Sequence, residues 1–185
     1  GFFELVAISV LTLGLVLALD GMTVRRLDRH TTIFRVLAVL LVALTGVILV
    51  SASQRMLLYE EQFGFTTLRV QTHVFMYWLA VLFGFFLLAL FRLRQRIFSL
   101  GVLLVMIGYL GTLNLMNVEG YIAERNIARA AEGHEIDFYY LSTFSVDALP
   151  AVLDLYQTTD SPELRESAGQ WLRLKLDQLD AVRRT

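Results

Sequence analysis

Cysteine is absent from this chain of 185 residues, which also holds only two prolines and a single lysine, Lys175. Without cysteine, the chain has no disulfide bonds, thiolate metal sites or cysteine nucleophiles. Charge is also scarce, since Asp, Glu, Lys and Arg make up 18% of the residues and the net charge is −1. Neither half carries the strongly basic face that nucleic-acid binding requires, so we expect no nucleic-acid partner.

Apolar residues dominate instead, at 56% of the chain, and the mean hydropathy is +0.60. Four long apolar runs cover about 2–19, 33–52, 74–91 and 97–118. An apolar helix of ~20 residues crosses a membrane and satisfies its own backbone hydrogen bonds there. The sequence therefore predicts an all-α fold: an integral membrane four-helix bundle over residues 1–118, in contact with membrane lipid, and a short external amphipathic helical tail over 119–185.

The arginines predict the orientation of this bundle. Two loops hold the clusters Arg25, Arg26 and Arg29, and Arg92, Arg94 and Arg96. The positive-inside rule places both loops in the cytoplasm, so the segment Ser53–His73, the tail and both ends of the chain are expected outside. The chain enters apolar sequence directly at Gly1. We therefore expect a C-terminal part of a longer protein of the bacterial inner membrane, with missing upstream spans or other membrane subunits as partners.

Two glycines of the fourth run, Gly101 and Gly108, are a heptad apart and share a helix face. Small residues on one face allow another helix to approach closely. Packing within the bundle and a dimer interface are both compatible with this pattern.

The tail contains several helix signals. We expect a helix over Val118–Ala131 that Gly133 ends, an aromatic helix over Asp137–Ser142, and a helix over Asp147–Thr158 with Pro150 in its first turn. Either Ser145 or Asp147 is positioned to cap the third helix. Ser161 is predicted to cap a last helix, which forms an antiparallel hairpin with the one before it.

Polar residues gather near the predicted outer face. The candidate cluster consists of Arg55, Tyr59, Glu60, Arg69, His73, Asn114, Asn117, Glu119 and Asn126. One interpretation is a polar pocket in which Arg55 or Arg69 holds an anionic group. The other is an interfacial elbow, turning near Gly64, with snorkelling arginines and Arg–Glu pairs. Because the third and fourth spans form a hairpin, we predict an Arg69–Glu119 contact, direct or through Asn117.

No cofactor is predicted. His73 as a metal or tetrapyrrole ligand is an alternative, but His30 is predicted on the opposite side of the membrane and His134 is far along the chain. Ser142, Ser145 and Asp147 lack the nucleophile-elbow pattern of hydrolases, so we expect no enzyme.

Two stretches resemble a known family. The first runs from Arg55 and Tyr59 through Phe63-Gly64-Phe65-Thr66 and Arg69 to Tyr77-Trp78-Leu79-Ala80; the second runs from Asn114, Asn117-Val118-Glu119-Gly120-Tyr121-Ile122-Ala123, Asn126 and Arg129 to Asp137, Tyr140-Leu141-Ser142 and Ser145-Val146-Asp147-Ala148-Leu149-Pro150. Together they resemble bacterial multi-span membrane proteins grouped as domain of unknown function 4173, which is related to domain of unknown function 4153. The resemblance covers roughly residues 50–155 and implies further spans upstream. The chain departs from the family's Asn-Pro-Asp pattern, because it has Asn117-Val118-Glu119 there.

Two functions remain open at this point. The first is a structural or interaction subunit that anchors or scaffolds an envelope or membrane complex. The second is part of a transporter or small-ligand sensor with a polar site at the outer membrane face. The spans lack ionisable residues near their midplane, and this favours the first function.

Overall fold

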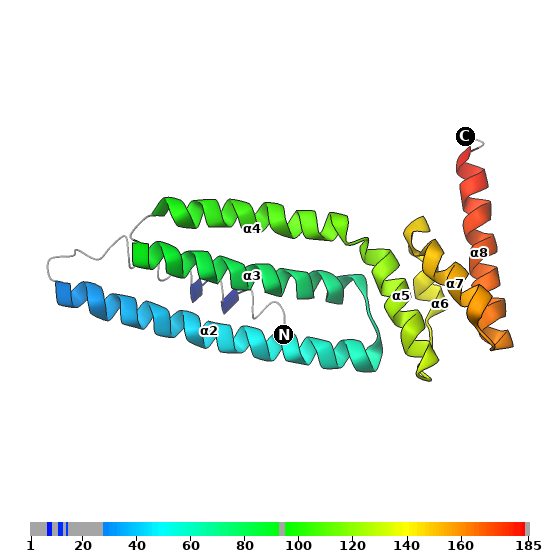
Figure 1. Ribbon diagram of the computed structural model, residues 1–185, viewed down its shortest axis with the longest axis horizontal. Coiled ribbons are helices and arrows are strands. Elements are labelled where there is room, and N and C mark those ends of the chain that lie inside the picture. Colours follow the sequence, from blue (N-terminus) through cyan, green and yellow to red (C-terminus); the bar gives the residue numbers. More distant parts are fainter. Residues whose placement is uncertain (1–6, 9–10, 13, 15–27, 93–94, 184–185) are drawn as a thin grey trace. The chain divides into compact units, whose positions relative to one another are not determined.

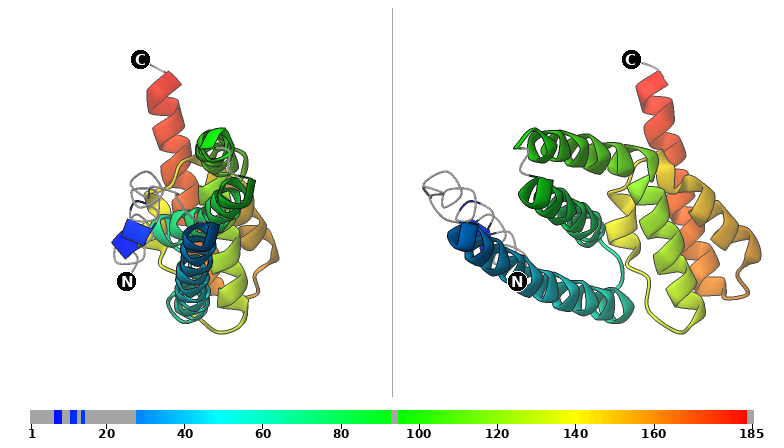
Figure 2. Two further views of the ribbon diagram at one scale, coloured as in Figure 1. Left: turned by 90° about the vertical axis from the view of Figure 1, so that its left-hand side faces the viewer. Right: turned by 60° about the vertical axis from the view of Figure 1, so that its left-hand side comes forward.

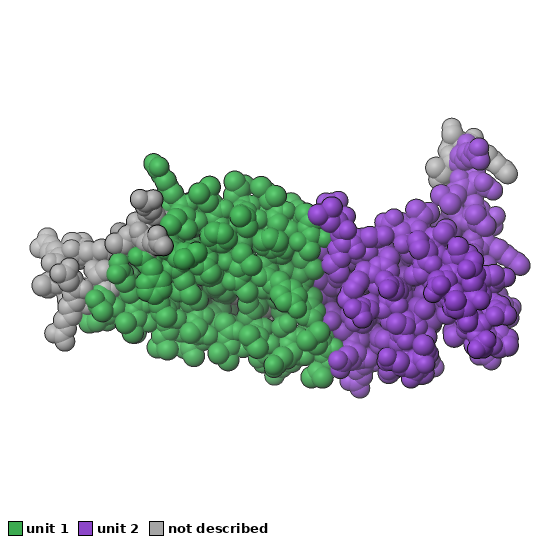
Figure 3. Space-filling model, viewed as in Figure 1, with its two compact units in different colours: residues 1–59, 71–112 green, residues 60–70, 113–185 purple. Residues whose placement is uncertain are grey.

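The computed structural model describes residues 7–8, 11–12, 14, 28–92 and 95–183, and across these ranges every regular element is helical (Figure 1). The chain divides into two compact units (Figure 3). The span unit contains residues 1–59 and 71–112, and the tail unit contains residues 60–70 and 113–185. The tail unit therefore takes in a short stretch between two spans as well as the C-terminal third.

Three long helices correspond to three of the predicted apolar runs: α2 (Asp28–Phe63), α3 (Thr67–Arg92) and α4 (Gln95–Leu115). Their segments Thr32–Phe63, Thr67–Phe91 and Arg96–Leu115 are long and apolar enough to cross a membrane. The first predicted run, about 2–19, lies almost entirely outside the described residues. The described part of the chain thus supports an all-α membrane protein with three candidate spans.

Helices α3 and α4 form the tight antiparallel hairpin that the short connection predicts (Figures 1 and 2). Contacts near the connection join Phe86 to Phe98, whose ring centroids are 5.8 Å apart. Toward the other end, the indole Nε1 of Trp78 donates to Thr112 Oγ1 at 3.1 Å. Residues earlier in α3 therefore contact residues later in α4, as two antiparallel helices require.

Gly101 and Gly108 lie against α3. An added Cβ would be 2.5 Å from Cβ of Phe85 at Gly101, and 2.1 Å from the ring of Trp78 at Gly108. Each glycine thus makes room for an aromatic side chain of the neighbouring helix. This observation supports packing within the bundle as the reason for the shared face.

The outer faces of α2 and α4 carry exposed apolar side chains, such as Leu37, Leu40, Leu103 and Ile107. Buried side chains such as Val42, Leu79 and Phe83 lie between α2 and α3. A surface this apolar is unfavourable in water and suits the hydrocarbon core of a membrane. In hydrocarbon, a helix satisfies the hydrogen bonds of its own backbone.

The tail unit contains α5 (Val118–Ala131), α6 (Phe138–Ser142), the 3₁₀ helix η1 (Val146–Ala148), α7 (Leu149–Thr158) and α8 (Pro162–Arg183). The predicted tail helices are confirmed, and Ser161 Oγ caps α8 by accepting from the backbone N–H of Leu164. Ser145 instead caps η1, which precedes α7. The reason is local, because the hydroxyl reaches the N–H of Asp147 only two residues away.

These helices enclose a core of their own. Ile122, Ala123, Ala148, Val152 and Ala168 are fully buried within it. Helix α5 packs on α7 and η1, while α8 packs on α6 and α7 (Figure 2). The last two helices form the predicted hairpin.

Candidate functional site

Only three residues separate α2 from α3 in the segment that we name the elbow, residues 60–70. The expected loop Ser53–His73 is wrong in extent, because α2 continues to Phe63 and α3 begins at Thr67. The predicted turn near Gly64 is confirmed. Gly64 has φ +78, and its N–H donates to the carbonyl of Glu60 at 3.0 Å. A left-handed glycine is a common way to end a helix.

The two helix ends leave main-chain groups without intrahelical partners. The elbow satisfies some of them itself. The guanidinium Nη1 of Arg69 donates to the carbonyls of Gly64 at 2.6 Å and Phe63 at 3.3 Å. The hydroxyl of Thr66 accepts from the N–H of Arg69 at 3.4 Å.

Helix α5 satisfies others. The side-chain Oδ1 of Asn126 accepts from the N–H of Phe65 at 2.8 Å, and its Nδ2 donates to the carbonyl of Phe65 at 3.0 Å. One turn along, Arg129 donates from Nε and Nη2 to the carbonyl of Glu61, at 3.1 and 2.8 Å. An amide side chain that pairs with both main-chain groups of one residue holds that residue in a fixed orientation.

Helix α6 reaches the other side of the turn. The hydroxyl of Tyr140 accepts from the N–H of Thr67, the first residue of α3, at 2.9 Å. It also lies 3.2 Å from the hydroxyl of Thr67. We name Asn126, Arg129 and Tyr140 the elbow clasp, because all three hold the main chain of the elbow.

Apolar contacts support the clasp. The ring of Phe65 packs edge-on against Tyr121 at 6.0 Å between centroids, and Val70 is buried in the tail core. An added Cβ at Gly64 would lie 2.7 Å from Arg129 Nη1 and 2.9 Å from Asn126 Oδ1. Gly64 is therefore needed twice, for its positive φ and for the room it leaves to the clasp.

The predicted Arg69–Glu119 contact is wrong. Arg69 donates to elbow carbonyls, and the Oε2 of Glu119 accepts from the N–H of Ser145 at 2.6 Å. Each charge finds main-chain groups that would otherwise lack partners. Asn117 also has a local role, because it adopts φ +46 and caps α5 by accepting from the N–H of Gly120.

The remaining cluster members are divided between the two units. Glu60 is only 3% exposed and Asn114 has an exposed side chain, both within the tail unit. In the span unit, Arg55 and Tyr59 are exposed. There, Nε2 of His73 lies 3.2 Å from the hydroxyl of Ser53. Each unit thus holds part of the predicted cluster.

His73, the alternative metal or tetrapyrrole ligand, contacts residues of its own unit. The ring of His73 stacks on Tyr77 at 5.7 Å, while its Nε2 is engaged by Ser53. Among residues 28–92 and 95–183, no group of three His, Asp or Glu side chains is arranged to hold a metal ion.

Two clasp residues, Arg129 and Tyr140, were missing from the predicted cluster. A signal for Arg129 was present, because it lies three residues after Asn126 on a helix and so shares its face. Tyr140 had no such signal. Its contact with Thr67 joins residues 73 positions apart, which local spacing does not reveal.

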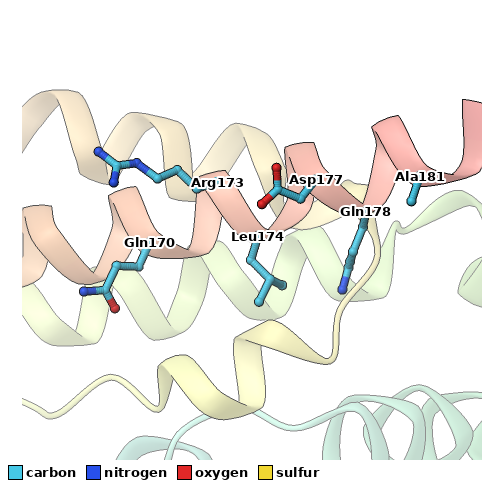
Figure 4. Close-up of a pocket in the computed structure, with 6 residues that line it drawn as sticks. All are labelled: Gln170, Arg173, Leu174, Asp177, Gln178 and Ala181. Carbon is cyan, nitrogen blue, oxygen red and sulfur yellow. The ribbon is translucent and has the colours of Figure 1, made fainter.

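A second feature of the tail unit is a shallow groove along α8 (Figure 4). Its volume is about 580 Å³, and its lining residues are Gln170, Arg173, Leu174, Asp177, Gln178 and Ala181. Leu174 is 44% exposed and lies among polar neighbours. Four of the six lining residues are polar, and the two apolar ones, Leu174 and Ala181, are seven positions apart on one face of α8.

The sequence match covers the elbow and the clasp together. Residues 1–155 match the family described as Domain of unknown function (DUF4153). The chain belongs to this family. The resemblance noted from the sequence was to domain of unknown function 4173, to which this family is related. It therefore indicated a related membrane family, and the match identifies domain 4153. No curated protein and no solved structure matches the chain. Helix α8 lies beyond the matched residues.

Proposed function

We propose that this protein is an integral membrane scaffold, whose spans anchor a tail that docks a protein of an envelope or membrane complex, with no catalytic activity of its own. The observation that carries this proposal is the elbow clasp. Asn126 and Arg69, two strong candidates for a ligand site, both bond to main-chain groups of the elbow. Polar groups used in this way stiffen a support and are not available to a substrate.

Polar contacts between the spans agree with a supporting role. Trp78 donates to Thr112 between α3 and α4, and Ser53 lies within hydrogen-bond distance of His73 between α2 and α3. The hydroxyls of the buried Thr12 and Thr45 are 3.4 Å apart. Such bonds hold helices together where the surrounding lipid provides no hydrophobic drive.

The alternative is a transporter or small-ligand sensor with a polar site at the outer face. It is less well supported, because Asn126 and Arg69 would have to leave their main-chain partners to bind a ligand. Breaking such bonds leaves partly buried main-chain groups unpaired, which costs about 1–3 kcal/mol for each group.

A docking experiment tests the scaffold directly. A photo-crosslinking residue replaces Leu174 in the groove, and a matched variant carries it at Leu176, another exposed leucine of α8. The two positions lie about 200° apart around the helix. We expect one stoichiometric protein adduct in native membranes from position 174, with little from 176. Adducts of equal yield from both positions, or no protein adduct, would count against the scaffold.

The proposal includes an orientation. The arginine clusters favour a bacterial inner-membrane protein whose tail and chain ends are external. Because the chain lacks cysteine, single substitutions Arg94→Cys and Ser161→Cys give clean probes. An impermeant thiol reagent should label Cys at 161 in intact cells and leave 94 unlabelled. The opposite pattern would invert the orientation.

A further inference from the structure

Helix α8 lies outside the family match but contributes to the tail core. Ala168 is fully buried, Trp171 is 4% exposed, and the single lysine of the chain, Lys175, is 5% exposed. The ammonium of Lys175 lies 5.6 Å from the centroid of the Trp171 ring. A lysine buried this deeply requires specific partners, because burial of an unpaired charge is costly.

Lys175 has one partner at the end of α6 and another on α8 itself. The indole Nε1 of Trp171 donates to the carbonyl of Leu141 at 2.9 Å. The ammonium of Lys175 donates to the carbonyl of Ser142 at 3.0 Å and to Oε1 of Gln178 at 3.1 Å. The carbonyl of Leu141 also accepts from the N–H of Phe144 at 3.1 Å, so α8 adds a second donor to Leu141 and a donor to the carbonyl of Ser142.

Helix α6 depends on such support. It has only five residues, and a helix this short is not stable by itself. Its other contacts include a cap, in which Asp137 accepts from the N–H of Tyr140, an edge-on contact between Tyr140 and Phe144, and the burial of Leu141 in the tail core. The same Tyr140 holds the first residue of α3 through its hydroxyl.

We propose that α8 is a strap: docking of its Trp171–Lys175 segment fixes α6, and α6 fixes the first turn of α3 through Tyr140. The elbow then has two supports of different kinds. The grip of Tyr140 on Thr67 depends on α8. The grip of Asn126 on Phe65 comes from α5 and does not. This coupling requires no partner protein, so it stands or falls separately from the scaffold role.

Backbone amide hydrogen exchange separates the two supports, because the N–H of Thr67 reports on Tyr140 and the N–H of Phe65 reports on Asn126. The variant Trp171→Phe/Lys175→Met removes both donors of the strap in the full chain in detergent. We expect exchange at Thr67 to rise roughly tenfold, from the loss of two hydrogen bonds, and exchange at Phe65 to change less than about twofold. The control Leu176→Ala, at an exposed position of α8, should change neither.

Two outcomes of this experiment would overturn the proposal. In the first, the strap residues exchange faster in the double variant while Thr67 is unchanged. In the second, Thr67 and Phe65 accelerate equally, because the tail then opens as one body.

A second variant covers the possibility that the double substitution does not fold. Tyr140→Phe removes only the hydroxyl that holds Thr67. Because coupling between two sites is reciprocal, exchange of the Trp171 indole N–H should also accelerate. An unchanged indole proton in a folded Tyr140→Phe protein would show that α8 and the elbow are independent, and would overturn the strap.

Discussion

The span unit and the tail unit use apolar residues in opposite ways. In the candidate span Arg96–Leu115 only 6% of the apolar stretch is buried, whereas the tail core contains side chains such as Ile122 and Val152 with no exposed surface. Polar side chains differ as well. In the spans, side chains of different helices bond to one another, as Trp78 does with Thr112. In the tail, side chains of one segment bond to the main chain of another, as Asn126 does with Phe65.

This contrast agrees with the proposal that the spans face lipid and the tail faces water. Lipid removes the hydrophobic drive between helices, so close approach and a few polar contacts must hold the spans together. The tail buries apolar area as a water-soluble domain does. It also receives the ends of α2 and α3, where the helix geometry leaves main-chain groups to be satisfied from outside.

The largest difference should appear when a large side chain is removed from each unit. Trp171→Ala should destabilise the tail by about 3–5 kcal/mol, since it deletes a buried indole together with its hydrogen bond to the carbonyl of Leu141. Leu104→Ala, at a side chain 48% exposed on α4, should cost far less. Denaturant titration in detergent measures the loss of stability in each variant. Hydrogen exchange at Ile122 reports on the tail separately. Equal losses would contradict the contrast.

The clasp gives the next effect in size. Asn126→Ala leaves both main-chain groups of Phe65 unpaired, and it should destabilise the tail by about 2–3 kcal/mol. Arg125→Ala is the matched control on the same helix, because Arg125 is exposed and only covers the ring of Tyr121. Thermal unfolding of the two variants distinguishes them. A loss of similar size for both would mean that Asn126 is not essential to the elbow.

These contrasts explain which features the sequence could predict. Apolar length identifies spans because lipid imposes a fixed thickness, and caps identify tail helices because their hydrogen bonds are local. Ser161 and Gly133 therefore marked helix boundaries correctly. The extension of α2 to Phe63 was missed, because the apolar run ends at Ala52 and the more polar sequence after it was expected to form a loop.

The candidate site was harder to predict for a physical reason. Titratable residues at the ends of neighbouring helices suggest an ion pair, as Arg69 and Glu119 did. In the structure they serve main-chain groups, whose positions depend on where helices end. Asn126 was identified as polar and important, but its partner, the main chain of Phe65, carries no side-chain signature.

A smaller effect tests how the spans approach one another. Gly108→Ala should destabilise the α3–α4 hairpin by about 1–3 kcal/mol, because the new methyl group would overlap the ring of Trp78. Gly111→Ala, where nothing lies within 4 Å, should be neutral or slightly stabilising, since alanine favours helix. Unfolding monitored by Trp78 fluorescence in a Trp171→Phe background compares the two. If Gly111→Ala were the more destabilising variant, the result would indicate that another helix packs against the face of α4 that holds Gly111.

The smallest expected effect is a coupling energy near zero. Arg69 and Glu119 each have a main-chain partner in the structure, so removing one should not change what the other contributes. In a double-mutant cycle, Arg69→Ala and Glu119→Ala should each destabilise the tail, and the double variant should lose their sum to within about 0.5 kcal/mol. The cycle is measured by denaturant unfolding at low and high salt, because a direct ion pair would also weaken with screening. A coupling energy well above that limit, lost at high salt, would restore the ion pair and remove Arg69 from the elbow's main-chain contacts.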